Sequence, residues 1–254
     1  MIRSYFFPSQ DHIPTSSNVR VRIRPEVLRF LHSDNIELKN FHLWAGAFKF
    51  EYGNYINIEN SRFSHSWEVG LLHSELAHQK GNIIWGGWYS NIRNATFEFI
   101  NSAFAIYQQD VMFPVMDNVL FQYNDWFNHT IYAPTIRHNY RGSCGNPLLC
   151  EDTIYGGSVS RYITMNQVWT GGFQPGLRSL VEYARIENQY LDQDGSGLQR
   201  TTGNATKSTT RYSWLINTNR NGMRLDSLCS GTEGYVHHVV AAGSKRGFRL
   251  KGDY

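Results

Sequence analysis

Four copies of a short phrase divide the last third of the chain into equal parts. Each copy is a glycine, an apolar residue and a long polar residue. The copies begin at Gly172, Gly197, Gly222 and Gly247, 25 residues apart. A fixed period of this length is typical of repeat proteins, in which each unit buries its apolar face only against its neighbours. Because apolar and polar residues alternate after each glycine, the phrase predicts a short strand with one buried face.

The same phrase continues upstream with irregular spacing. Helical repeats are disfavoured, because the units lack apolar residues at spacings of three and four. The apolar position of each phrase is therefore predicted to point inward as one ladder of strand residues: Phe48, Leu71, Phe104, Ile131, Phe173, Leu198, Met223 and Phe248.

A second phrase, apolar-x-apolar followed by Asn-x-x-apolar, lies between the copies of the first. Asparagine tolerates the left-handed backbone conformation that bends a chain, and stacked side-chain amides can hydrogen-bond to one another. Later units carry Ala184, Ser213 or Val239 in place of the asparagine. The rungs of Ala184 and Val239 are predicted to be looser or differently bent. The asparagines predicted to lie at bends are Asn40, Asn60, Asn94, Asn118 and Asn166.

These phrases predict an all-β protein, a single-stranded right-handed parallel β-helix of about eight or nine rungs with little helix. One domain is expected over residues 1–254, with an N-terminal arm at 1–17 and long loops at 64–88 and 126–157. The sequence shows no polar cap at its C-terminal end, which favours a piece of a longer protein. The alternative is an antiparallel sandwich, but Asn-Gly hairpin signals between strands are scarce.

Several of these stretches resemble a known group of proteins. Ser179–Tyr183, Asp194–Gln199, Asn221–Asp226, Tyr235–His238 and Gly247–Tyr254 are similar to secreted right-handed parallel β-helix proteins of the pectate-lyase-like superfamily. The resemblance is one of repeat pattern and covers the chain from about Val19 onward. It implies this fold and an extracellular or cell-surface location. It also implies one of the superfamily's roles, which include polysaccharide lyase, glycoside hydrolase, epimerase, phage tailspike and adhesin.

Composition further limits the classes of protein to which the chain could belong. Aromatic residues make up 15% of the chain and charged residues 18%, which suits an interior built from stacked apolar ladders. The 24 basic and 21 acidic residues nearly balance, and no basic run or recognisable module suggests nucleic-acid binding. No apolar stretch approaches the roughly 18 residues of a membrane span.

Cys144 and Cys150 bracket a turn-rich loop and are predicted to form a disulfide in an oxidising compartment, leaving Cys229 unpaired.

The residue after each inward position is predicted to point outward. In the regular repeats this gives Gln174, Gln199, Arg224 and Arg249, with Asp226 and Lys251 two positions further along. Tyr132 occupies the matching position upstream. Arginine holds carboxylate or sulfate in a bidentate way, so this ladder favours an acidic polysaccharide as the ligand. The alternative is an ordinary solvated face of a repeat protein.

The catalytic candidates are Asp194, Asp226, Arg224 and His238. Two carboxylates would suit a glycosidase, whereas a base beside cations would suit a lyase. Asp192 and Asp194 lie one residue apart in a glycine-rich turn, where they could bind Ca²⁺ or simply form the turn. The sequence leaves open a lyase, a hydrolase and a non-catalytic binding or adhesion protein.

Overall fold

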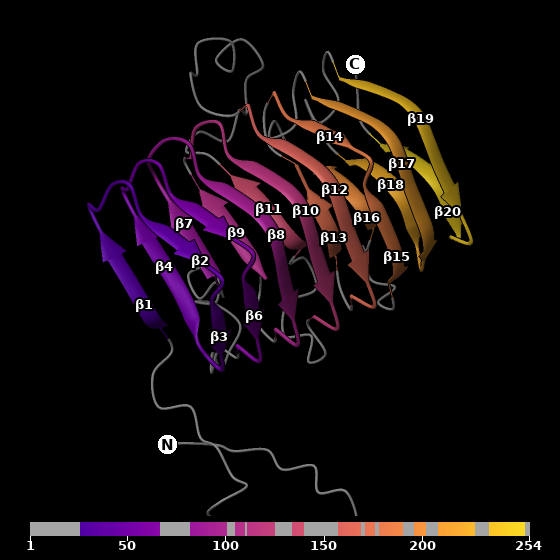
Figure 1. Ribbon diagram of the computed structural model, residues 1–254. Coiled ribbons are helices and arrows are strands. Elements are labelled where there is room, and N and C mark those ends of the chain that lie inside the picture. Colours follow the sequence, from indigo (N-terminus) through magenta and orange to yellow (C-terminus); the bar gives the residue numbers. More distant parts are fainter. Residues whose placement is uncertain are drawn as a thin grey trace, which may run out of the picture.

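The chain forms an all-β structure. The computed structural model describes residues 26–66, 82–100, 105–109, 111–124, 134–139, 157–168, 171–175, 178–189, 196–201, 208–226 and 234–251. Within these residues the secondary structure consists of strands, without a helix (Figure 1). The first ten strands are β1 (Glu26–Leu31), β2 (Glu37–Lys39), β3 (His42–Trp44), β4 (Ala47–Glu51), β5 (Asn57–Glu59), β6 (Arg62–Ser64), β7 (Asn82–Trp85), β8 (Asn91–Glu98), β9 (Ile106–Gln109) and β10 (Val115–Gln122). The others are β11 (Pro134–Asn139), β12 (Val159–Asn166), β13 (Gly171–Gln174), β14 (Leu180–Glu182), β15 (Arg185–Gln189), β16 (Ser196–Thr201), β17 (Thr209–Thr218), β18 (Asn221–Asp226), β19 (Tyr235–Ala242) and β20 (Arg246–Lys251).

The strands form two sheets, and every strand pairing among the described residues is parallel. The nine-stranded sheet has the order β1-β4-β7-β9-β11-β13-β16-β18-β20. The eleven-stranded sheet contains the remaining strands. Neighbours within a sheet are separated in sequence by strands of the other sheet, so the chain passes alternately through both sheets. Successive passages, which we call rungs, stack side by side (Figure 1). This arrangement is compatible with a β-helix, and the all-β prediction is confirmed.

The core lies between the two sheets and consists of side chains stacked from rung to rung. Phe63, Phe97 and Phe121 are fully buried in successive strands. Their ring centroids lie 4.9 and 5.1 Å apart, with the planes 15° and 8° from parallel. Met165 continues the row in β12. The spacing of paired strands, about 4.8 Å, explains why identical side chains stack so readily here.

Left-handed residues bend each rung at intervals of five residues in the eleven-stranded sheet. Tyr89, Asn94 and Phe99 have φ of 59°, 48° and 51°. Between two such residues, side chains alternate between inside and outside. The residue after each bend points inward again. Successive buried positions are therefore three residues apart across a bend and two residues apart between bends. Thus Ile92, Ala95 and Phe97 are all buried.

Two rows of these corner residues run along the eleven-stranded sheet, and we call them the first and second corner rows. The first row is Asn40, Asn60, Asn94, Asn118, Tyr162, Tyr183, Tyr212 and His238. The second row is Ala45, His65, Phe99, Tyr123, Gln167, Asn188, Asn217 and Gly243.

Each corner row is held by amide hydrogen bonds in one half and by stacked rings in the other. In the first row, Nδ2 of Asn94 donates to Oδ1 of Asn60 at 3.1 Å, and Asn118 donates to Asn94 at 2.9 Å. Further along, the Tyr162 and Tyr183 rings stack at 5.1 Å. A left-handed non-glycine residue costs about 1–3 kcal/mol, and these side-chain contacts oppose that cost.

The predicted bends are partly confirmed. Asn40, Asn60, Asn94 and Asn118 have the left-handed conformation. Asn166 was a wrong assignment, because the bend falls on the next residue, Gln167 (φ 53°).

The predicted different bending at Ala184 and Val239, and the placement of a bend at Ser213, were also wrong. The bends fall on the preceding residues, Tyr183, Tyr212 and His238, whose φ of 53°, 49° and 53° match that of Asn40 at 53°. Ala184 and Ser213 are instead buried at the inward position that follows the bend.

The inward ladder of the nine-stranded sheet is confirmed at Phe48 and in the last third, and it is wrong at the three positions between. Phe173, Leu198, Met223 and Phe248 pair in register. Upstream, the paired positions are Ile136, Ile106 and Asn82, in place of Ile131, Phe104 and Leu71. Asn82 is buried with its amide satisfied, since Oδ1 accepts from the Phe48 N–H and Nδ2 donates to the Ala105 carbonyl.

Each of the two predicted long loops contains a strand. β7 lies within 64–88, and β11 lies within 126–157. The cysteine pair Cys144 and Cys150, together with Cys229 and the arm 1–17, lies outside the described residues. Among the described residues, no helix is long and apolar enough to cross a membrane.

Candidate functional site

The predicted outward ladder comes together at the C-terminal end of the nine-stranded sheet. Gln199 of β16 pairs with Arg224 of β18, which pairs with Arg249 of β20. Asp226 pairs with Lys251 two positions further along. Gln174 follows the paired residue Phe173 in β13. These strands therefore place two arginines in register in neighbouring rungs.

Two of the predicted properties do not hold. Arg224 was expected to be exposed, but only 5% of its surface is accessible. His238 lies in β19 of the other sheet, at a corner, where its ring packs 4.9 Å from that of Tyr212 and its Nδ1 lies 2.7 Å from Nδ1 of His237. It is therefore not part of the arginine ladder.

Three of the predicted site residues cannot be placed. Asp192, Asp194 and Tyr132 lie outside the described residues. Within the described ranges, no group of three or more His, Cys, Asp or Glu side chains is arranged to hold a metal ion. The possible calcium site at Asp192 and Asp194 remains a prediction.

Arg249 has an unusual environment within the ladder. Its side chain is partly buried, and among the described residues its Nη1 atom is buried without a hydrogen-bond acceptor. A buried charged donor left without an acceptor is unfavourable by more than the roughly 1–3 kcal/mol of a neutral group. That atom is itself buried, so an anion outside the protein cannot reach it.

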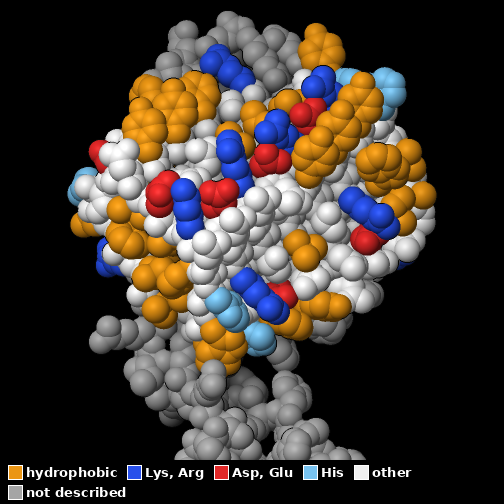
Figure 2. Space-filling model, viewed as in Figure 1, with side chains coloured by type: hydrophobic (Ala, Val, Ile, Leu, Met, Phe, Trp, Pro, Cys, Tyr) orange, Lys and Arg blue, Asp and Glu red, His pale blue; other side chains and the backbone are white. Residues whose placement is uncertain are grey.

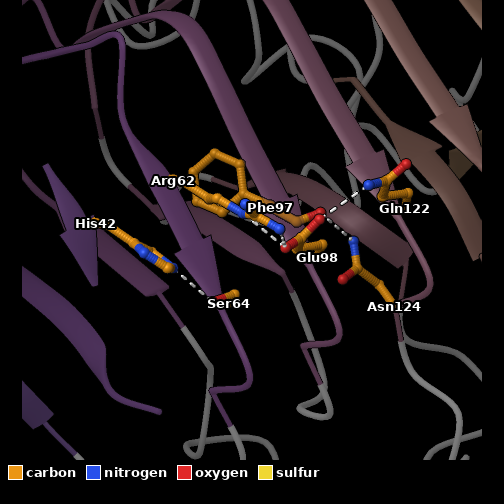
Figure 3. A network of polar contacts seen from close by, with 7 residues as sticks. All are labelled: His42, Arg62, Ser64, Phe97, Glu98, Gln122 and Asn124. Carbon is orange, nitrogen blue, oxygen red and sulfur yellow. Dashed lines mark hydrogen bonds and ion pairs between the residues drawn. The ribbon is translucent and has the colours of Figure 1, made fainter. Parts of the chain in front are cut away.

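A second polar cluster, which sequence reasoning missed, surrounds Glu98 at the end of β8 (Figure 3). Glu98 is buried although its neighbours in sequence place it on the outer side of the sheet. Arg62 of β6 donates through Nε to Oε1 of Glu98 at 2.7 Å, and a second guanidinium nitrogen of Arg62 contacts the same oxygen. Gln122 of β10 donates to Oε2 at 2.8 Å. Three successive rungs thus converge on one carboxylate.

These three rungs, and the rung of β3 that precedes them, are joined by further polar contacts. Asn124 donates to the Phe97 carbonyl at 3.1 Å and accepts from the Ile100 N–H at 3.0 Å. His42 Nε2 lies 2.9 Å from the Ser64 hydroxyl (Figure 3).

The environment keeps Glu98 ionised and His65 neutral at neutral pH. Burial favours the uncharged form of Glu98, but hydrogen bonds from Gln122 and Arg62 and the charge of Arg62 outweigh burial, so its pKa is lowered. Partial burial of the His65 ring lowers its pKa, and the nearby charge of Arg62 adds to this, against the attraction of Glu98. Glu98 is therefore a poor proton donor, and its arginine partner restricts it as a base.

Within the described part of the chain, the Glu98 cluster offers a single carboxyl group. Hydrolysis of a glycosidic bond uses two carboxyl groups on opposite sides of the bond. Among the residues drawn in Figure 3, Glu98 is the single acid. The contacts described suit a polar clamp that joins three rungs.

A row of alternating charges crosses the outer face of the eleven-stranded sheet, directly beside the first corner row (Figure 2). Asp117 and Arg161 approach to 2.8 Å, and Glu182 and Arg211 to 2.7 Å. Because neighbours neutralise one another, this charge row offers little net charge to a charged polymer. In register order it consists of Lys39, Glu59, Arg93, Asp117, Arg161, Glu182 and Arg211, followed by His237.

Exposed aromatic rings gather at the corners. Tyr162, Tyr183 and Phe99 are 53%, 40% and 39% exposed. The rings of each row stack on one another, with Phe99 and Tyr123 at 5.0 Å. Since ring faces are taken up by neighbouring rings, the corners present mainly ring edges to solvent. This arrangement is unlike an open aromatic platform for a sugar ring.

Comparison with known proteins adds no assignment. The chain matches no protein-family model, and neither curated proteins nor solved structures give a match. The function must therefore be argued from the chain's own residues.

Proposed function

We propose that the chain is a right-handed parallel β-helix of about eight or nine rungs, of the secreted pectate-lyase-like kind. Its parallel pairing supports this proposal, because crossovers between parallel strands of one sheet are right-handed in about 98% of cases. The nine strands of one sheet, each from a different passage of the chain, support the number of rungs.

We propose further that the protein binds an acidic extracellular polysaccharide along the C-terminal rungs of the nine-stranded sheet. The observation that carries this proposal is the register of Arg224 and Arg249 in neighbouring strands, with the Arg249 side chain partly exposed. Two arginines in register raise the positive potential on this part of the sheet. A polymer with regularly spaced carboxylates or sulfates would be attracted to it.

The two arginines have different roles in this proposal. Arg249 is partly exposed and would contact the polymer. Arg224 is nearly buried, so it would add positive potential beneath the polymer. The charge row on the other sheet is the weaker candidate surface, since its ions already pair with each other.

Cleavage of the polysaccharide is the second candidate function. The observation in its favour is that Asp226 and Lys251 pair in register two positions beyond the arginines, which brings an acid and a base to the same strands. A carboxylate beside cations could remove a proton next to a uronic-acid carboxylate. Binding ranks first because the register of Arg224 and Arg249 supports it, whereas the catalytic candidate Asp194 lies outside the described residues.

The test compares an acidic polysaccharide, polygalacturonate, with neutral dextran by affinity electrophoresis and calorimetry. Arg249→Ala should weaken polygalacturonate binding at least tenfold, or about 1.4 kcal/mol. Arg185→Ala removes the same charge from β15 on the other sheet, where Arg185 pairs with Glu187, and should leave binding unchanged. Equal loss in both variants, or parent binding that does not distinguish the polymers, would refute the proposal.

The same samples distinguish binding from cleavage. A lyase produces an unsaturated sugar that absorbs in the ultraviolet, whereas a hydrolase produces reducing ends without that absorbance. If the parent produces either signal, Asp226→Asn should abolish it while binding remains. A parent that binds polygalacturonate without either product would be a non-catalytic binding protein.

A further inference from the structure

Two consecutive histidines of β19 share the outer surface of the eleven-stranded sheet. His237 pairs in register with Arg211 of the charge row, and His238 occupies the first corner row with φ of 53°. In a straight strand, consecutive side chains point to opposite faces of the sheet. The left-handed bend at His238 breaks this alternation, and both histidines are exposed.

The two imidazole rings direct the same nitrogen atom toward each other. The Nδ1 atoms lie 2.7 Å apart, and the ring planes are 81° from parallel. A contact this short between two ring nitrogens requires a lone pair on at least one of them, since two N–H groups would clash. Once neither Nδ1 carries a proton, the pair offers two lone pairs in one place.

Tyr212 of the neighbouring strand β17 contacts both rings. Its ring centroid lies 4.9 Å from that of His238 and 5.8 Å from that of His237. Because these contacts restrict the rotation of both imidazoles, a ligand that binds them would lose less free energy in ordering them.

The distance between the nitrogens indicates which kind of ion the pair suits. Transition-metal ions bind histidine nitrogen at about 2.0–2.1 Å, so two nitrogens on one ion lie about 2.9 Å apart at a right angle and about 3.3 Å apart at a tetrahedral angle. The observed 2.7 Å is closer to the right-angle arrangement. Cu²⁺ and Ni²⁺ adopt that arrangement, whereas Zn²⁺ prefers the tetrahedral one.

The charge of Arg211 beside His237 is compensated by an acid. Arg211 donates through Nε to Glu182 at 2.8 Å, and its Nη2 lies 2.7 Å from the same carboxylate. This ion pair reduces the repulsion that a cation at the histidines would meet. Within the described ranges no third His, Cys, Asp or Glu joins the pair, so water would complete the coordination.

We propose that His237 and His238 together bind one Cu²⁺ or Ni²⁺ ion through their Nδ1 atoms. Each ring then carries its proton on Nε2, which leaves both Nδ1 lone pairs for the ion. The pair lies on the eleven-stranded sheet, so metal binding here is independent of polysaccharide binding at the arginine ladder on the other sheet.

The first test is calorimetric titration of the full chain, without a polyhistidine tag, with Ni²⁺. His237→Ala and His238→Phe should each weaken binding by about tenfold or more, because one imidazole alone gives up the second metal bond. Phenylalanine keeps a ring at the corner, as Phe99 does at φ 51°. His42→Ala is the matched control, since it removes an exposed imidazole from β3, and it should leave the affinity unchanged.

The second test uses Cu²⁺ and does not depend on the stability of a variant. At one equivalent of Cu²⁺, electron paramagnetic resonance of the parent should show coupling to two imidazole nitrogens, and that of His238→Phe to one. A parent that binds neither ion, or a spectrum with a single imidazole, would overturn the proposal. It would also be overturned if His237→Ala bound Ni²⁺ as the parent does, or if His42→Ala lost as much affinity.

Discussion

The interior stack of phenylalanines should carry far more of the folding free energy than the corner stack two residues away. Phe97 is 0% exposed and stacks on Phe63 and Phe121 at 4.9 and 5.1 Å. Replacing a core phenylalanine with alanine removes its burial and leaves a cavity, a loss of about 3–5 kcal/mol. Loss of two aromatic contacts places Phe97→Ala toward the upper part of that range, about 4 kcal/mol.

Phe99→Ala is the variant to compare with Phe97→Ala, because Phe99 lies directly after the end of the same strand, β8. Phe99 also stacks on two rings, His65 and Tyr123, at 4.9 and 5.0 Å. It is, however, 39% exposed, and alanine keeps the same left-handed strain at φ 51°. We therefore expect a loss of only about 1 kcal/mol.

Urea unfolding followed by far-ultraviolet circular dichroism measures both losses as shifts of the midpoint at constant slope. Repeat proteins can unfold in parts, so a changed slope would require amide hydrogen exchange to locate the rungs that open. If Phe99→Ala lost as much free energy as Phe97→Ala, ring stacking rather than burial would hold the rungs together.

Three further predictions address the clamp, a tight turn and the corners. The lowered pKa of Glu98 means that its carboxylate stabilises the fold above the ordinary glutamate value of 4.5, and this contribution is lost as the pH falls through the lower folded value. Glu98→Gln should therefore flatten the acid side of a melting-temperature profile, and an unchanged profile would contradict the assigned clamp. Gly87 has φ 92°, and an added Cβ would lie 1.9 Å from the Gly53 carbonyl oxygen, so Gly87→Ala should cost at least about 2 kcal/mol by urea unfolding; a near-neutral result would show that the turn can shift. Tyr162→Asn should be tolerated, because it extends the row of asparagines that ends at the neighbouring Asn118. Tyr183→Asn places an amide between the Tyr162 and Tyr212 rings and should lower the melting temperature more. If Tyr162→Asn lowered the melting temperature more than Tyr183→Asn, the division of the corner row into an amide part and a ring part would be refuted.

The sequence was most informative where the repeat is regular. A constant step of 25 residues predicted the register of Phe173, Leu198, Met223 and Phe248, because each rung there has the same length. Upstream, the connections between rungs differ in length, and apolar-polar alternation alone does not distinguish a strand from a neighbouring loop. The predicted ladder therefore missed Asn82, a buried polar residue whose amide is satisfied from two adjacent strands. No apolar signal marks such a residue.

For the candidate site, too, the prediction succeeded in the regular repeats and failed elsewhere. The register of Gln199, Arg224 and Arg249 was predicted from the regular repeats. The burial of Arg224 was not, because it depends on what covers the outer face of the sheet. The Glu98 clamp was also missed, because Arg62, Glu98 and Gln122 lie 24–36 residues apart at irregular intervals. Glu98 and Gln122 each stand directly before a bend, at Phe99 and Tyr123. This shared position can be recognised only once the bends have been located.

The misplaced bend at Asn166 has a specific cause in how the two corner rows are built. In the rung of β10, the amide corner is Asn118 and the ring corner is Tyr123, five residues later. In the next rung the order is reversed, with Tyr162 first and Gln167 second. Following asparagine from rung to rung therefore leads from one corner row to the other. The feature that persists is the five-residue interval, because each bend requires a residue that tolerates φ near 50°. Asparagine, tyrosine, phenylalanine, histidine and glutamine all occupy these positions, so the bends are better found by spacing than by residue type.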